Sequence, residues 1–220
     1  MKTKTHALPR KATLGAAAAS AVFALPAQAD AAIVYSGLQN ITATIGSGSG
    51  RATQLLNLDA LGSAEFRIRV NRSHLSGTHG SAHLFPAAIG NQMISNGSGG
   101  LKKLASGANI SAGGPFGGNG ILRGFSSIPL NRGTWASNQS GFAGVQFLNS
   151  GNTLYGWIRL KWTDSADANP EPNTITAIDW AYNDTPNGSI LAGQVPEPSQ
   201  ALLALAGLGA VALRRRRKEA

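Results

Sequence analysis

Three histidines, His74, His79 and His83, fall within ten residues of one another. Three imidazoles could hold a zinc ion and leave a fourth position open for water. Their spacings of five and four residues do not match the HExxH motif, and no carboxylate lies between them. We therefore favour a polar hairpin over a zinc site and predict no bound metal and no cofactor.

A second group of possible metal ligands lies in one short turn. Asp164, Asp167, Asn169 and Glu171 offer hard oxygen atoms, which suit calcium. The EF-hand pattern is absent, and two prolines restrict the same stretch. A solvated turn is the favoured interpretation, and calcium is the strongest of the metal alternatives.

Tyr155 and Trp157 fall on the same face of the alternating stretch at residues 153–162. Exposed aromatic rings of this kind could stack on sugar rings and make the chain a carbohydrate-binding module. A second sheet could equally bury both rings, and we favour burial.

A pair of acids also lies close in sequence. Asp179 and Asp184 flank Trp180 and Tyr182, an arrangement that the two carboxylates of a polysaccharide hydrolase could take beside a sugar platform. Glycosidase carboxylates stand about 5–10 Å apart across a cleft. Alternation places Asp179 on the face opposite Trp180, which predicts an exposed position on a strand rather than a catalytic one.

Other catalytic signatures are missing from the sequence. There is no cysteine and no G-x-S-x-G elbow, and the glycines at 46–51 lack the spacing of a phosphate-binding loop. The absence of cysteine excludes disulfides, thiolate nucleophiles and cysteine-ligated zinc. We predict that the chain is not an enzyme.

The elements that must position these residues are strands. Apolar and polar residues alternate at 64–70, 141–149, 153–162 and 173–182, with shorter candidates at 39–45, 53–58, 81–85 and 188–192. Turn-forming residues separate them at 150–152, 164–173 and 183–188. The glycine-rich region 90–140 is expected to form long loops. These patterns predict an all-β fold, an antiparallel β-sandwich or jelly roll.

The formal charge of +9 comes mainly from the two ends. Residues 30–195 hold ten Lys/Arg against eight Asp/Glu, a net charge of only +2. A nucleic-acid surface needs clustered cations on the folded domain, so we predict no nucleic-acid partner.

The N-terminal segment has the three parts of an export signal. A basic start is followed by an apolar stretch from Ala12 to Leu25, and Ala27 and Ala29 supply the small residues that signal peptidase reads. We predict a signal helix in 1–29, cleavage after Ala29, and an extracellular β domain in 30–194.

The C-terminal segment, 195–220, also has three parts. Val195, Pro196, Glu197 and Pro198 form an extended strip, followed by the thirteen apolar residues 201–213 and then by a basic cluster. The apolar run spans about 20 Å as a helix, shorter than the roughly 20 residues of a comfortable membrane span. The cluster consists of Arg214, Arg215, Arg216 and Arg217, which keep this end cytoplasmic. An ordinary uncleaved transmembrane anchor is the alternative to a temporary one.

This order of strip, apolar helix and arginines resembles the PEP-CTERM sorting signal of Gram-negative, exopolysaccharide-producing bacteria. The block at 141–199, with Gly-Trp-Ile-Arg-Leu and Asp-Trp-Ala-Tyr, is similar to the C-terminal half of many proteins that carry this signal. The resemblance implies recognition by a membrane exosortase, cleavage near the strip, and delivery to the outer surface or matrix. We therefore expect a structural or adhesive role in exopolysaccharide, with a carbohydrate-binding module and a matrix hydrolase as alternatives.

Overall fold

The computed structural model describes residues 32–46, 49–73, 79–118, 120–124, 133, 135–164 and 172–197, and these residues contain strands and no helix. The strands are β1 (Ile33–Tyr35), β2 (Ile41–Thr44), β3 (Gly50–Leu56), β4 (Phe66–Ser73), β5 (His79–Pro86), β6 (Gln92–Ile94), β7 (Asn109–Ile110), β8 (Phe116–Gly117), β9 (Gly120–Gly124), β10 (Ser140–Asn149), β11 (Asn152–Asp164), β12 (Pro172–Asn183) and β13 (Ile190–Leu191).

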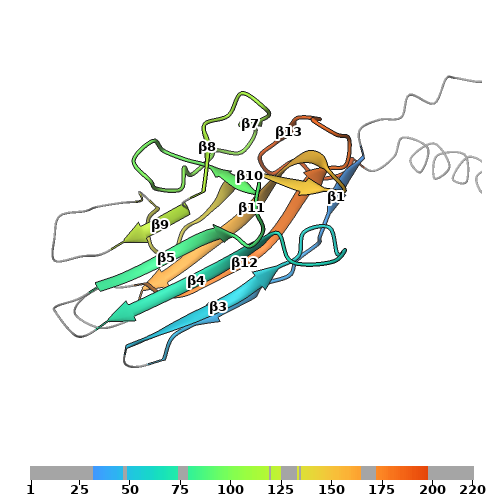
Figure 1. Cartoon of the computed structure of the whole chain (residues 1–220). Helices are drawn as coiled ribbons and strands as arrows, with labels where there is room; N and C mark the ends of the chain where they lie inside the picture. The colour runs from blue at the N-terminus through green and yellow to red at the C-terminus, as the bar shows by residue number, and fades with distance from the viewer. Residues whose placement is uncertain are drawn as a thin grey trace, which may run out of the picture. The chain divides into compact units, whose positions relative to one another are not determined.

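Two antiparallel sheets account for most of these strands (Figure 1). The larger sheet has seven strands in the order β1-β12-β11-β10-β6-β8, with β2 pairing with β12 on the same edge as β1. The smaller sheet has four strands in the order β3-β4-β5-β9. Each sheet contains a meander of three consecutive strands, β10-β11-β12 in one and β3-β4-β5 in the other. The predicted all-β antiparallel fold is confirmed.

The hairpin between β10 and β11 shows how local sequence fixes register. Asn149 pairs with Asn152, and the two residues between them have positive φ, 50° at Ser150 and 82° at Gly151. A two-residue turn of this hand matches the right-handed twist of the flanking strands. The long β10–β11 ladder that follows positions Trp157 and Arg159.

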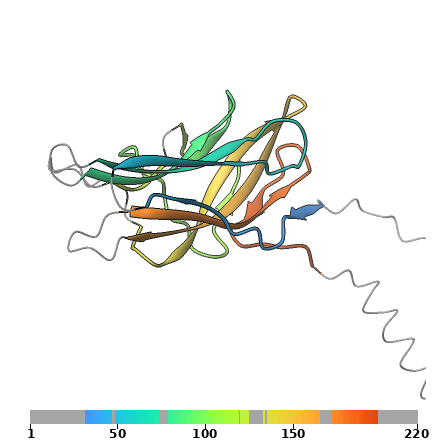
Figure 2. The same cartoon turned by 90° about the horizontal axis from the view of Figure 1, so that it is seen from below.

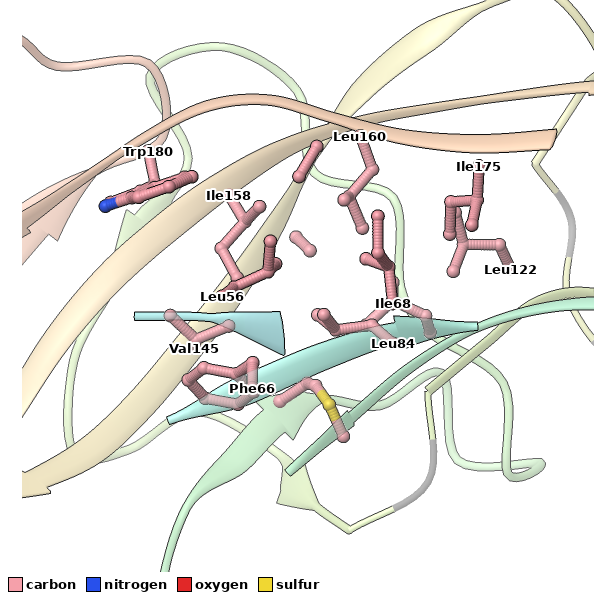
Figure 3. Close-up of a cluster of buried hydrophobic side chains, with 14 of the residues drawn as sticks. Leu56, Phe66, Ile68, Leu84, Leu122, Val145, Ile158, Leu160, Ile175 and Trp180 are labelled. Carbon is pink, nitrogen blue, oxygen red and sulfur yellow. The ribbon is translucent and has the colours of Figure 1, made fainter. Parts of the chain in front are cut away.

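The main core lies between the two sheets, which form separate layers in Figure 2. Apolar side chains of the smaller sheet, such as Phe66, Ile68 and Leu84, meet Ile158 and Leu160 of the larger sheet (Figure 3). All five are fully buried. This packing is that of a β-sandwich, in which the inward positions of each strand make the core.

A second apolar cluster covers part of the opposite face of the larger sheet. There Tyr155 and Trp157 of β11 pack with Ile110 of β7 and Ile190 of β13, together with Leu104. The strands β7 and β13 pair with each other as a two-stranded sheet. One strand, β11, therefore buries side chains on both of its faces over this part of its length.

The expected long loops at 90–140 contain four short strands, β6 to β9, and β1 was not predicted at all. The predicted signal helix in 1–29 and the sorting helix after the strip lie outside the described residues. Among the residues that are described, we find no helix with the length and apolar character needed to cross a membrane.

Candidate functional site

The described chain ends within the sorting strip, at Glu197, and the last strand, β13, lies just before the strip. Ile190 and Ala192 are both buried. The Ala192 amide donates to the carbonyl of Ala108 at 2.8 Å, and Ala192 accepts from the Gly107 amide at 2.9 Å. Both backbone groups of Ala192 are thus hydrogen-bonded, and both bonds go to the segment that precedes β7.

Gln194 closes a tight turn directly after this strand. Its amide donates to the carbonyl of Leu191 at 2.9 Å, and its Oε1 accepts from the Leu191 amide at 3.0 Å. Gly193, between them, has φ of +83°, a conformation that glycine adopts without the strain of a side chain. The Gln194 carbonyl accepts a hydrogen bond from the indole Nε1 of Trp157 at 3.0 Å. Sequence reasoning did not identify Gln194.

The chain becomes exposed immediately after Gln194. Val195 is 44% exposed, and Pro196 and Glu197 are exposed as well. Proline cannot donate a backbone hydrogen bond to a neighbouring strand, so this strip does not extend the sheet. A hydrogen-bonded end followed at once by an extended, exposed strip is a suitable substrate for a protease or transpeptidase cleft. Pro198 lies outside the described residues.

Trp157 packs beneath the junction, by which we mean the turn at Gln194 where the fold meets the exposed strip. It is only 2% exposed, its ring lies 6.2 Å from that of Tyr35, and it makes an edge-on contact of 5.2 Å with Phe142. Tyr155 is 3% exposed and packs 5.8 Å from Phe116. Neither Tyr155 nor Trp157 is available as a sugar platform, because the segments around β7 and β13 cover that face of β11. The structure buries both aromatic rings, which is the interpretation favoured from the sequence.

Asp179 differs from its predicted exposed position, since it is 1% exposed. Its face is covered by Tyr35, whose hydroxyl donates to Oδ2 at 2.8 Å, and by Arg159, whose Nε donates to Oδ1 at 2.8 Å. Arg159 also pairs with Oδ2, which makes a bidentate ion pair. The hydrogen bond to Asp179 raises the pKa of Tyr35 above its usual value. This carboxylate is a structural tie between β1, β11 and β12.

Alternation correctly placed Asp179 on the face opposite Trp180, but it could not show that Tyr35 and Arg159 cover that face. The β11–β12 register shifts between Arg159 and Leu160, so that Arg159 faces Asp179 and Leu160 faces Ala177. Ile178 has no partner on β11 and instead accepts hydrogen bonds from the amides of Gln39 and Asn40. The two-residue periodicity of β12 therefore breaks at Ile178, one residue before Asp179, and the break does not itself bury Asp179.

The metal candidates are not assembled in the described part of the chain. Asp167, Asn169 and Glu171 lie outside it, as do His74 and the signal residues Ala27 and Ala29. The terminal arginines 214–217 lie outside it too. No group of three His, Asp or Glu side chains within the described ranges is placed to hold a metal ion. His83 instead stacks on Phe85 at 4.8 Å.

The smaller sheet carries a group of arginines beside an aromatic ring, which the sequence showed only as the polar side of an alternating strand. Arg67 and Arg69 alternate with core residues on β4, and both guanidinium groups lie over the ring of Phe85 on β5. The signal was present in two short alternating stretches, Arg-Ile-Arg and His-Leu-Phe, but only pairing β4 with β5 brings them together.

Residues 194–218 match the family model described as the PEP-CTERM protein-sorting motif. No curated protein and no solved structure matched the chain. The start of the matched segment coincides with Gln194, where the hydrogen-bonded fold ends and the exposed strip begins. The motif implies export, processing by an exosortase-type system and transient anchoring at the membrane. The chain thus carries a PEP-CTERM protein-sorting motif, and this motif directly follows an all-β domain.

Proposed function

We propose that the chain is a non-catalytic protein of the outer surface or extracellular matrix of a Gram-negative bacterium. Its β domain remains after signal peptidase and an exosortase remove the two ends, and it serves a structural or adhesive role in exopolysaccharide. The observation that carries this proposal is the junction at Gln194. Cleavage anywhere in the exposed strip leaves the domain's buried end and the Trp157 hydrogen bond intact.

The described acids favour a non-catalytic role over hydrolysis. Asp179 is neutralised by Arg159, and Asp184 accepts a hydrogen bond from the Ala32 amide. Glu65 is buried and its Oε2 accepts from the Leu58 amide at 2.6 Å, where burial raises the pKa of the carboxyl above its usual value. Each of these three carboxylates ties a loop or an edge to the sheets.

The chain supplies a matched control for its own sorting strip. A second Pro-Glu-Pro sequence occurs at residues 170–172, without an apolar run or arginines after it. The full chain would be expressed in its exosortase-containing host as P196A/E197A and, for comparison, as P170A/E171A. We expect the first variant to stay in the membrane fraction and the second to be released like the parent protein.

The role in the matrix is tested by fractionation of the same cells. We expect the parent protein in the washed polysaccharide matrix, without a rise in reducing ends when the purified protein is added to that matrix. Recovery of the mature protein only as a free solute in the medium would contradict an adhesive role. A rise in reducing ends would favour the hydrolase alternative instead.

A further inference from the structure

The four strands of the smaller sheet carry an uneven set of charges. Strands β3, β4, β5 and β9 contain five arginines and no aspartate, glutamate or lysine. Half of the ten basic residues between positions 30 and 195 therefore lie on one small sheet. The small net charge of the domain therefore does not reveal this local concentration of arginines.

Three of these arginines share the outer face of the sheet. Because Phe66, Ile68 and Val70 point into the core, Arg67 and Arg69 point the other way. The ladders pair Arg67 with Phe85 and Arg69 with His83 on β5. On β3, Arg51 lies opposite Asn71 and donates from Nε to its Oδ1 at 3.1 Å. We call Arg51, Arg67, Arg69, His83 and Phe85 the arginine face; it is the side of β3, β4 and β5 away from the larger sheet (Figure 2).

Two guanidinium groups of the arginine face, those of Arg67 and Arg69, lie over the ring of Phe85. The Arg69 guanidinium carbon lies 4.5 Å from the centre of the Phe85 ring, and that of Arg67 lies 5.7 Å from it. His83 stacks on Phe85 with an angle of 10° between the rings. Contact with an aromatic ring occupies the flat side of a guanidinium and leaves its in-plane N–H groups free for an oxyanion.

The described part of the domain supplies no carboxylate that neutralises the positive charge of this face. Within the described ranges, none of Arg51, Arg67 and Arg69 forms an ion pair with a carboxylate. The Nε atoms of Arg67 and Arg69 are buried and have no hydrogen-bond partner. Burial, followed by the charges of Arg51 and Arg67, lowers the pKa of Arg69 below its usual value. An external anion would relieve this repulsion.

We propose that the arginine face binds an acidic polysaccharide, with uronate carboxylates on the guanidinium groups. Guanidinium groups bind carboxylates in a bidentate manner, and successive outward positions of a strand lie about 7 Å apart. A flat row of such positions suits an extended polymer. The inference rests on the proposed function only in that the matrix supplies the polymer.

The experiment uses the released, mature protein and measures binding to sodium alginate and to neutral dextran of similar length. We expect alginate binding that weakens as salt rises from 50 to 200 mM, as binding through counterion release requires, and no binding to dextran. The variant R67Q/R69Q should lose at least about tenfold in alginate affinity, and R69K should fall between it and the parent, because lysine keeps the charge but not the bidentate geometry.

The control variant is K102Q/K161Q, which removes two positive charges from outside the smaller sheet. It should bind alginate within about twofold of the parent protein. Equal losses in the two double variants, or unchanged binding in R67Q/R69Q, would overturn the proposal. Tighter binding to duplex DNA of the same charge than to alginate would also overturn it. Loss of the thermal unfolding transition in both R67Q/R69Q and R69K would overturn it too, because the arginines would then be needed for folding. Matrix localisation without alginate binding would reject this inference alone, whereas absence from the matrix would reject the proposed function.

Discussion

The indole of Trp157 donates its hydrogen bond to the carbonyl of Gln194, the first residue of the matched sorting segment. This contact joins the centre of the larger sheet to the point where the domain ends. The position at which the fold ends therefore depends on core packing, because the Trp157 side chain that binds Gln194 is itself buried.

Replacing Trp157 with phenylalanine should loosen this junction. We expect W157F to lower the free energy of unfolding by about 1–3 kcal/mol, from the lost hydrogen bond and the smaller ring. Hydrogen exchange at the amides of Ala192 and Gln194 should become faster. The matched control is W180F, which loses an indole hydrogen bond to Leu58 at 3.1 Å elsewhere. Equal acceleration at 192–194 in both variants would count against a specific junction.

The ion pair between Arg159 and Asp179 predicts an asymmetric result. The Arg159 side chain is 33% exposed and that of Asp179 only 2%. R159Q leaves a buried carboxylate without its counter-charge and should cost about 3 kcal/mol, whereas D179N leaves an arginine that reaches water and should cost less. Chemical denaturation of both variants measures the difference, and a larger loss in D179N would contradict the asymmetry that the burial of the carboxylate predicts.

Gly156 of the Gly-Trp-Ile-Arg-Leu stretch is required by a close approach of strands. A Cβ atom there would lie 2.7 Å from the carbonyl oxygen of Ala181 and 3.0 Å from the Cβ of Tyr182. G156A should therefore lower the melting temperature through a loss of about 1–3 kcal/mol. In G141A the new Cβ meets only the Lys103 side chain, which can move, so a much smaller shift is expected. Similar shifts in the two variants would contradict this explanation.

His83 should make stability depend on pH. Burial, followed by the charge of Arg69, lowers its pKa to about 4, below the ordinary 6.5. Between these two pH values the unfolded chain binds the proton and the folded chain does not, so stability falls as pH drops from about 6.5 to about 4. The loss is on the order of 3 kcal/mol at most. H83Q should remove this part of the slope; an unchanged slope would show that His83 is not the group responsible.

Local sequence patterns predicted the strands well because alternation and turn residues are local causes. The hairpin at Ser150 and Gly151, and the inward face at Ile158 and Leu160, follow directly from them. Burial of Tyr155 and Trp157 on the second face of β11 was favoured from the sequence, but the elements that cover them could not be identified, because β7 and β13 are two residues each and far apart in the chain. The same limit hid the burial of Asp179, because Tyr35 of β1 and Arg159 of β11 cover its side of β12.

The sorting strip was the more predictable part of the site, since its signal is a linear order of residue types that acts as an extended segment. The arginine face was not, because it arises only when β4 pairs with β5 and sets Arg69 beside Phe85. Sites made by lateral pairing of strands leave no continuous motif in the sequence.

The central claim is that both ends are removed and the β domain between them is released. Intact-mass analysis of the extracellular protein tests it most directly. We predict a single chain that begins near Asp30 and ends between Val195 and Ser199, just beyond the Gln194 carbonyl held by Trp157. A released protein that still carries Arg214 to Arg217 would contradict the account.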